Sequence, residues 1–334
     1  MTEKSIKDLT IIGAGPSGLF AAFYAGMRQL SVQIIDSLAQ VGGQPHALYP
    51  DKAIFDIGAL PQITGKELSQ ALLEQVKPFA STTSFHFNHD ITEITDEGDY
   101  FSLKSQKACF YSRAVLIAAG GGAFRPRSAN IKNEAEFEGD KLFYTVNQAQ
   151  DFQDQEVAIL GGGDTALDNA LLVSQYAKKL YLVHRRDKFR GHEFSQAQLK
   201  AKSNVEIITP YQAKAIHTLE GSQQVELLLA KSRSQESRTL QVDSIISSYG
   251  FQANINAFKS WPIESLGQRI PVNEHMQTSL AGVYAIGDIC TYTGKTQLIA
   301  SGFGEAPTAI NAITHYLYPE EKLAPLHSTT YFKK

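Results

Sequence analysis

Two stretches of the chain show the same order of hydrophobic and polar positions. In each, a short apolar run leads into a glycine-rich turn, a longer helical pattern and a second short apolar run. The first copy has apolar runs at 9–12 and 31–36 around a helical pattern at 19–25, and the second has runs at 156–160 and 180–183 around a pattern at 167–177. Short apolar runs bounded by turns are typical of buried parallel strands. The pattern therefore predicts a duplicated strand–turn–helix–strand unit.

The turn of the first copy has G-x-G-x-x-G spacing, with glycines at 13, 15 and 18. In such turns Gly13 permits the tight bend, Gly15 lets the backbone approach a pyrophosphate, and Gly18 lets helix and strand pack closely. The free N–H groups at the helix start then face the phosphates. A purely structural turn is the alternative, but the strand before it and the helix after it favour a dinucleotide site.

Acidic residues end two of the predicted strands. Asp36 follows the second strand of the first copy, where a carboxylate accepts hydrogen bonds from a ribose. Because a 2′-phosphate would meet a like charge there, Asp36 favours FAD or NAD over NADP. Asp288 follows the apolar run 282–286 and is a candidate for a second hydroxylated chain, such as the ribityl of FAD, or an ordinary strand-terminal acid.

The turn of the second copy has glycines at 161 and 163 and alanine at 166, which is the tolerated G-x-G-x-x-A variant. No acid ends the following strand, and arginines stand at 185, 186 and 190 instead. Guanidinium groups suit a 2′-phosphate, although a solvated basic loop is the alternative. An acid in one copy and arginines in the other predict FAD in the first site and NADPH in the second.

Glycine-rich segments at 118–122 and 247–251 flank the second copy and are interpreted as linkers. The predicted fold class is α/β, with two Rossmann-like nucleotide-binding domains of the three-layer ββα type. The NADPH domain, residues 120–249, is predicted to be inserted into the FAD domain, residues 1–119 and 250–334.

Composition limits the remaining function classes. The 334 residues carry a formal net charge of −3, which argues against a nucleic-acid-binding surface over the whole protein. The two cysteines, Cys109 and Cys290, form no C-x-x-C, so neither a dithiol redox motif nor a cysteine-rich zinc site is expected. No signal peptide or membrane-spanning run is recognised, and the expected location is the cytoplasm.

The chain resembles the low-molecular-weight, thioredoxin-reductase-like flavoproteins, and within them the ferredoxin/flavodoxin–NADP(+) reductases of the bacterial thioredoxin-reductase type. The resemblance covers nearly the whole chain. It is carried by the motifs Gly13-Ala14-Gly15-Pro16-Ser17-Gly18, Gly42-Gly43-Gln44, Tyr49-Pro50-Asp51-Lys52, Gly161-Gly162-Gly163-Asp164-Thr165-Ala166, His184-Arg185-Arg186, Tyr284-Ala285-Ile286-Gly287-Asp288 and Leu326-His327-Ser328-Thr329.

One departure from thioredoxin reductase decides the expected activity. The stretch 142–149, which matches the place of that enzyme's C-x-x-C, has no cysteine. Without a dithiol relay, the acceptor must take electrons from the flavin directly. The resemblance therefore implies hydride exchange between NADPH and flavin N5, followed by single-electron transfer to ferredoxin or flavodoxin. The alternatives are an NADPH oxidase or quinone reductase without a dithiol, and a non-catalytic flavin or nucleotide sensor.

The resemblance also implies which residues contact the cofactors. Because the flavin carries the chemistry, no side-chain acid or nucleophile is expected, and Tyr49 and His327 would stack on its two faces. The FAD contacts implied are Gly13, Gly15, Ser17, Gly18, Asp36, Gly43, Gln44, Tyr49, Ile91, Phe124, Asp288 and Thr329. The NADPH contacts implied are Gly161, Gly163, Asp164, Thr165, Ala166, His184, Arg185, Arg186 and Arg190.

The expected partners are a ferredoxin or flavodoxin and a second copy of the chain. In this reductase type the C-terminal tail crosses a homodimer and covers the partner's flavin, so a homodimer is expected. No nucleic acid, membrane or metal is expected. An acidic carrier would need a positive surface, for which the candidates are Arg125, Arg127, Lys132, Lys178 and Lys179. The sequence leaves open the carrier, the direction of electron flow, the redox potential and the docking residues.

Overall fold

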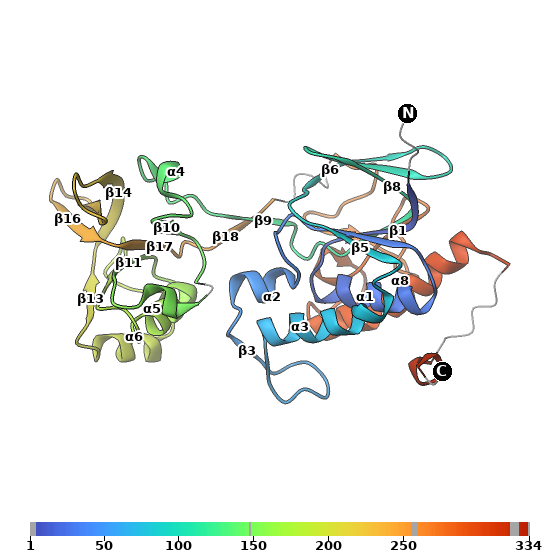
Figure 1. Ribbon diagram of the computed structural model, residues 1–334, viewed down its shortest axis with the longest axis horizontal. Coiled ribbons are helices and arrows are strands. Elements are labelled where there is room, and N and C mark those ends of the chain that lie inside the picture. The colour runs from blue at the N-terminus through green and yellow to red at the C-terminus, as the bar shows by residue number, and fades with distance from the viewer. Residues whose placement is uncertain (1–4, 147, 255–259, 321–326, 333–334) are drawn as a thin grey trace. The chain divides into compact units, whose positions relative to one another are not determined.

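The computed structural model describes residues 5–146, 148–254, 260–320 and 327–332, with side chains throughout except at 123–126, 252–254 and 330. The chain divides into two compact units (Figure 1). Unit 1 comprises Met1–Phe124 and Ala253–Lys334, and unit 2 comprises Arg125–Gln252. The sequence of unit 2 therefore interrupts that of unit 1.

The central sheet of unit 1 is mainly parallel. Strands β5 (Thr83–His86), β2 (Val32–Ile35), β1 (Ile6–Ile12) and β8 (Cys109–Ile117) follow one another in that order, and β20 (Val283–Ala285) pairs with β8. Strands β7 (Phe101–Ser105) and β6 (Ile91–Asp96) extend the sheet with antiparallel pairing. Leu9 lies opposite both Val32 and Ala114, so β1 occupies the middle of the parallel part.

Side chains alternate between the two faces of each strand, and both faces of this sheet are packed against apolar clusters. Leu9 and Ile11 pack with Ala22 of α1 (Pro16–Met27) and Ile310 of α8 (Ile299–Leu317). Ile12 points to the opposite face, into a separate core cluster. Helix α3 (Gly65–Val76) begins with a capping box formed by Thr64 and Glu67. The remaining elements of unit 1 are α2 (Gly43–Leu48), β3 (Ala53–Ile54), β4 (Ile63–Thr64), η1 (Lys77–Phe79), β19 (Ile270–Pro271), η3 (Gly287–Ile289), β21 (Cys290–Thr291) and α9 (Ser328–Tyr331).

Asp8 on β1 links the sheet to the end of α8. Its carboxylate accepts hydrogen bonds from the Ser31 backbone N–H at 2.8 Å and the Ser31 hydroxyl at 2.7 Å. It also accepts one from the Tyr318 hydroxyl at 2.8 Å. Burial alone would raise the pKa of Asp8, but these donors outweigh it and hold the pKa below its usual value.

Unit 2 is built in three layers. Its parallel sheet has the order β10 (Leu142–Phe143), β17 (Ser244–Ser247), β11 (Glu156–Leu160), β12 (Lys179–Val183) and β13 (Val205–Ile208). Val157 and Ile159 face α5 (Asp164–Val173) and α6 (Glu193–Lys200), whereas Ala158 and Leu160 face an antiparallel sheet. That sheet consists of β14 (Tyr211–Thr218), β15 (Val225–Lys231) and β16 (Ser237–Val242). The predicted α/β fold class is confirmed.

The chain passes between the units at two places. Strands β9 (Ala123–Pro126) and β18 (Phe251–Asn254) pair there as a two-stranded ribbon. Unit 2 also contains α4 (Glu134–Phe137) and η2 (Ala149–Phe152). Among the described residues, none of the helices combines the length and the apolar character that crossing a bilayer requires.

Candidate functional site

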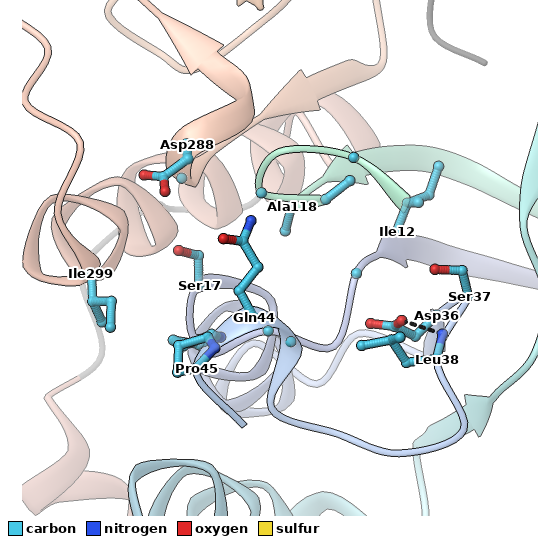
Figure 2. A pocket seen from close by; sticks show the side chains of 18 of the residues that line it. Ile12, Ser17, Asp36, Ser37, Leu38, Gln44, Pro45, Ala118, Asp288 and Ile299 are labelled. Carbon is cyan, nitrogen blue, oxygen red and sulfur yellow. Dashed lines mark hydrogen bonds between the residues drawn. The ribbon is translucent and has the colours of Figure 1, made fainter. Parts of the chain in front are cut away.

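A cavity of about 300 Å³ lies in unit 1, along the carboxyl ends of the parallel strands. Figure 2 shows Asp36, Ser37 and Leu38 at one end, and Asp288, Ser17 and Gln44 at the other. Nine of the predicted FAD residues line this cavity, and they are Gly13, Gly15, Ser17, Asp36, Gly43, Gln44, Tyr49, Ile91 and Asp288. Residues from five separate parts of the sequence therefore meet around one elongated space.

The three glycines of the first turn have different surroundings. Gly13 has φ +110°, and a Cβ there would lie 2.4 Å from the carbonyl oxygen of Ala118. A Cβ on Gly18 would lie 1.9 Å from the carbonyl oxygen of Gly13. A Cβ on Gly15 would have only the Cα of Gly43 within 4 Å, at 3.7 Å. Gly13 and Gly18 thus allow close packing, while Gly15 leaves open the approach to the start of α1.

The start of α1 is suited to an anion. Gly15 is the N-cap residue, Pro16 occupies the first turn, and no side chain caps the helix. The first N–H groups of a helix have no partner within it, and the helix dipole favours negative charge there. A helix start of this kind is typical of phosphate-binding sites.

Asp36 closes the opposite end of the cavity. Its carboxylate accepts hydrogen bonds from the backbone N–H groups of Ala14, at 2.6 Å, and Leu38, at 2.8 Å. Burial raises the pKa of Asp36, and the backbone hydrogen bonds offset this only in part. These two hydrogen bonds tie the side chain to the glycine turn and to the loop after β2, and Asp36 lines the cavity there (Figure 2).

Tyr49 lies at the other end, at the C-cap of α2. Its side chain lines the cavity and remains 40% exposed, and the Lys52 ammonium group lies 5.8 Å from the ring centroid. Burial, and then the negative charge of Asp288, raise the pKa of Tyr49. A ring that is half in the cavity and half in solvent can cover a planar group bound beside it.

Three predicted FAD contacts are not among the lining residues. Gly18 serves helix packing, and the side chain of Phe124 lies outside the described residues. Thr329, in α9, is exposed, as is His327. The rings of Tyr331 and Phe332 in this tail pack on Phe79 of the same unit, at centroid distances of 5.5 Å and 6.2 Å. Flavin contact by the tail therefore stays a prediction.

The second glycine turn, in unit 2, has the same construction as the first. A Cβ on Gly161 would meet the Cβ of buried Ala166 at 2.8 Å, whereas nothing lies within 4 Å of a Cβ on Gly163. Helix α5 begins immediately afterwards, with Asp164 and Thr165 in its first turn. The Asp164 carboxylate accepts the His192 backbone N–H at 2.9 Å, which holds the following loop against the helix start.

That loop carries the predicted arginines. Arg185, Arg186 and Arg190 are exposed. The backbone N–H of Arg190 donates a hydrogen bond to the Gly162 carbonyl at 2.8 Å. His184 is buried, and its ring stacks on Phe189 at 5.1 Å. Burial, and then the neighbouring arginines, lower the pKa of His184. His184 is therefore neutral near pH 7 and packs against Gly162 of the turn, while the three arginines are exposed.

Several lining residues were not predicted as contacts. They are Ile12, Pro16, Ile35, Ser37, Leu38, Pro45, Asp56, His89, Asp90, Ala118, Ala119, Gly120, Gly122, Trp261, Gly287, Gln297, Leu298 and Ile299. The segment 118–122 had been interpreted only as a linker, although its position after a strand could have indicated a site. Trp261 and Gln297 had no local signal, because the fold brings them in from distant parts of the chain.

Known proteins of similar sequence belong to one family of oxidoreductases. The chain matches the model of the pyridine nucleotide-disulphide oxidoreductase family over residues 7–313. It is 43% identical to a ferredoxin–NADP reductase of Streptococcus mutans, covering 99% of this chain and 98% of the relative. It is 45% identical to a ferredoxin–NADP reductase of Limosilactobacillus fermentum, covering 97% of each.

Similar solved structures agree on the fold. Thioredoxin reductase of Lactococcus lactis has a TM-score of 0.69 at 22% identity and covers 94% of this chain and 99% of that one. Thioredoxin reductase of T. acidophilum has a TM-score of 0.67 at 22% identity and covers 92% and 97%. At this level of identity the likeness shows a shared two-domain architecture.

Proposed function

The chain belongs to the pyridine nucleotide-disulphide oxidoreductase family, and we propose that it is an FAD-dependent ferredoxin–NADP(+) reductase. The observation that carries the proposal is the 43–45% identity, over nearly the whole length, to relatives named ferredoxin–NADP reductase. Cys109 and Cys290 are both unpaired thiols, and neither lies in the stretch 142–149 where a dithiol relay would stand.

Unit 1 is proposed to hold FAD. The open backbone at Gly15 and the start of α1 would bind the pyrophosphate, and Asp36 would accept hydrogen bonds from the adenosine ribose. Asp288 would bind the hydroxylated chain of the flavin, with Gln44 and Tyr49 beside the ring. When bound, FAD exchanges a hydride with NADP(H) and passes electrons singly to a carrier. The protein orients the reacting groups and excludes water from them.

Unit 2 is proposed to hold NADP(H). Gly163 would admit the pyrophosphate at the start of α5, and Arg185, Arg186 and Arg190 would bind the 2′-phosphate. Guanidinium groups form bidentate, charge-assisted hydrogen bonds with phosphate, and NADH offers no such group at that place. The buried carboxylate of Asp36 would repel a 2′-phosphate in the first site. The two sites therefore sort their dinucleotides by charge.

The carrier is proposed to be a ferredoxin, with flavodoxin as the alternative. Of the candidate docking cations, Lys178 and Lys179 form ion pairs with Glu156 and Glu206, each at 3.1 Å. Arg127 and Lys132 are exposed, as is Lys178, and remain candidates for contact with an acidic carrier. Arg125 has a side chain outside the described residues.

The assembly is proposed to be a homodimer in the cytoplasm, with the C-terminal tail of one chain over the flavin of the other. Exposed Tyr49 and exposed His327 are consistent with rings that meet a partner and a flavin. The two unpaired cysteines are typical of a reducing compartment. Sedimentation of the purified protein tests the dimer, and a monomer at micromolar concentration would contradict it. Removing residues after 321 should leave FAD bound and change the flavin spectrum.

Anaerobic reduction of the flavin tests the proposed function directly. The purified protein should be yellow with non-covalent FAD, and NADPH should bleach it at concentrations where NADH does not. Colourless protein that takes up no added FAD would exclude the proposal. Flavin that NADPH does not bleach would favour a sensor. Bleaching followed by rapid reoxidation in air, with no preference for a protein carrier, would favour an oxidase or quinone reductase.

A further inference from the structure

A buried group of ionisable side chains lies directly behind the Gly287–Asp288 turn. Glu305 of α8 is at its centre, only 4% exposed. One carboxylate oxygen accepts the Gly287 backbone N–H at 2.7 Å. The other accepts the Tyr292 hydroxyl at 2.7 Å and the Lys295 ammonium group. The Lys295 side chain is 2% exposed, so both members of this ion pair are withdrawn from water.

A buried ion pair of this kind adds little to the stability of a protein. Transferring two charges out of water costs about as much as their attraction returns, and apolar residues of similar size are often equally stable. A single unpaired charge in the same place would be strongly unfavourable. Stability alone therefore does not explain why this pair is present. Its position behind the cavity wall suggests a role in the site instead.

The turn that the pair supports forms part of the cavity wall. Gly287 and Asp288 both line the cavity, whereas Glu305 and Lys295 stand behind them. Gly287 has φ +74°, and a Cβ there would lie 3.0 Å from the Ser17 hydroxyl oxygen. The turn is therefore fixed between the start of α1, which carries Ser17, and the carboxylate of Glu305 on α8. Figure 2 shows the Asp288 carboxylate directed into the space beside Ser17.

The charges of the pair also reach the cavity. Burial raises the pKa of Asp288, Lys295 lowers it, and Glu305 raises it. The two charges therefore act on Asp288 in opposite directions and partly cancel there. The Glu305 carboxylate is a single hydrogen bond away from the cavity wall, so an imbalance in the pair would act on any group bound at this end.

We propose that Glu305 and Lys295 are positioning residues of the flavin site. Glu305 holds the Gly287–Asp288 turn where Asp288 meets the polar chain of the flavin. Lys295 forms an ion pair with the carboxylate of Glu305 and balances its charge, so that the wall behind the flavin gains no net charge from the pair. The inference rests on the proposed function only in assigning FAD to this cavity.

Single substitutions unbalance the pair in opposite senses. Glu305→Gln preserves the shape and an acceptor for the Gly287 N–H, but it leaves the Lys295 cation unpaired. Lys295→Met leaves the Glu305 anion unpaired. Reduction adds negative charge to the flavin, so a nearby cation favours the reduced form and a nearby anion opposes it. The double variant Lys295→Met/Glu305→Gln removes both charges.

The test is a flavin reduction potential, measured on the FAD-loaded protein with a chemical reductant and a reference dye. The potential should rise in Glu305→Gln, fall in Lys295→Met and return towards the wild-type value in the double variant. Glu134→Gln is the matched control, since Glu134 also accepts several hydrogen bonds but lies in unit 2. It should leave the potential unchanged, even if the protein melts earlier.

Affinity for FAD tests the positioning role separately. Glu305→Ala removes the acceptor for Gly287 and should raise the FAD dissociation constant roughly 10- to 100-fold. Glu305→Gln should recover most of that loss. Shifts of potential in the same direction for both single charge variants, or no shift in either, would overturn the inference.

Because the reductant is chemical, these results do not depend on a carrier. Protein that shows the opposite shifts but fails to reduce ferredoxin would contradict the proposed function alone. Protein that reduces ferredoxin but shows no opposite shifts would contradict only the role of the pair.

Discussion

Replacing Gly15 by alanine should weaken FAD binding without harming the fold. The new Cβ would meet only the Cα of Gly43, at an ordinary contact distance of 3.7 Å, and Gly15 already has φ −75°. Glycine is the better N-cap residue, but alanine restricts the unfolded chain. The unfolding free energy of the FAD-free protein should therefore change by no more than about 1 kcal/mol.

The same Cβ would occupy the space through which a pyrophosphate approaches the start of α1. Each hydrogen bond to a charged phosphate oxygen is worth about 1.5–3 kcal/mol. Losing one should raise the FAD dissociation constant roughly 10- to 100-fold, and Gly15→Val should raise it further. Fluorescence titration of the FAD-free protein gives the constant, and urea denaturation gives the stability.

Gly13→Ala is the contrasting variant. At φ +110°, with the Ala118 carbonyl oxygen 2.4 Å from the new Cβ, it should destabilise the fold itself. Wild-type FAD affinity in Gly15→Ala would refute the placement of the pyrophosphate, and a large loss of stability in that variant would refute the reading of Gly15 as an open position.

Three further outcomes are expected. Arg185→Ala and Arg186→Ala should each raise the KM for NADPH roughly 10- to 100-fold and barely change that for NADH; equal weakening of both coenzymes would mean that these exposed arginines are structural. A thiol reagent should modify Cys109 but not Cys290 in the native protein, because Cys290 is buried and burial raises its pKa to about 12, and rapid modification of both would contradict this. Asp8→Asn should lower the melting temperature at neutral pH, because the lowered pKa of Asp8 adds stability above the unfolded-state pKa of about 3.9. That stability is lost as pH falls through the folded-state pKa, so melting curves at a series of pH values should converge on the acid side, and a difference that persists there would contradict the assignment.

The sequence predicted the two nucleotide units well because their signals are local. A G-x-G-x-x-G turn, the strand before it and the charged residue after the next strand all lie within about 30 residues. Gly15 and Gly163 needed no knowledge of the rest of the chain. In the structure both lie at the start of a helix, where a Cβ on Gly15 would make one ordinary contact and a Cβ on Gly163 would meet nothing within 4 Å.

Contacts that depend on distant packing were harder to predict. Helix α8 begins at Ile299 and accommodates Pro307 within it. The lining residues 297–299 lie at the start of this helix and belong to none of the sequence motifs. The pairing of Glu305 with Lys295 depends on a turn at 292–295 that folds back onto α8. No periodic pattern in the sequence predicts this contact. The residues at this end of the cavity are therefore brought together by tertiary contacts and not by local sequence patterns.

The proposed reductase exchanges electrons between NADP(H), FAD and a ferredoxin. The most direct measurement is the NADPH-dependent reduction of cytochrome c by the FAD-loaded protein, with and without added ferredoxin. Ferredoxin should stimulate the rate strongly. The stimulation should saturate with ferredoxin concentration and be lost when NADH replaces NADPH at equal concentration. A rate that ferredoxin and flavodoxin leave unchanged, in protein whose flavin NADPH does reduce, would exclude the proposed function.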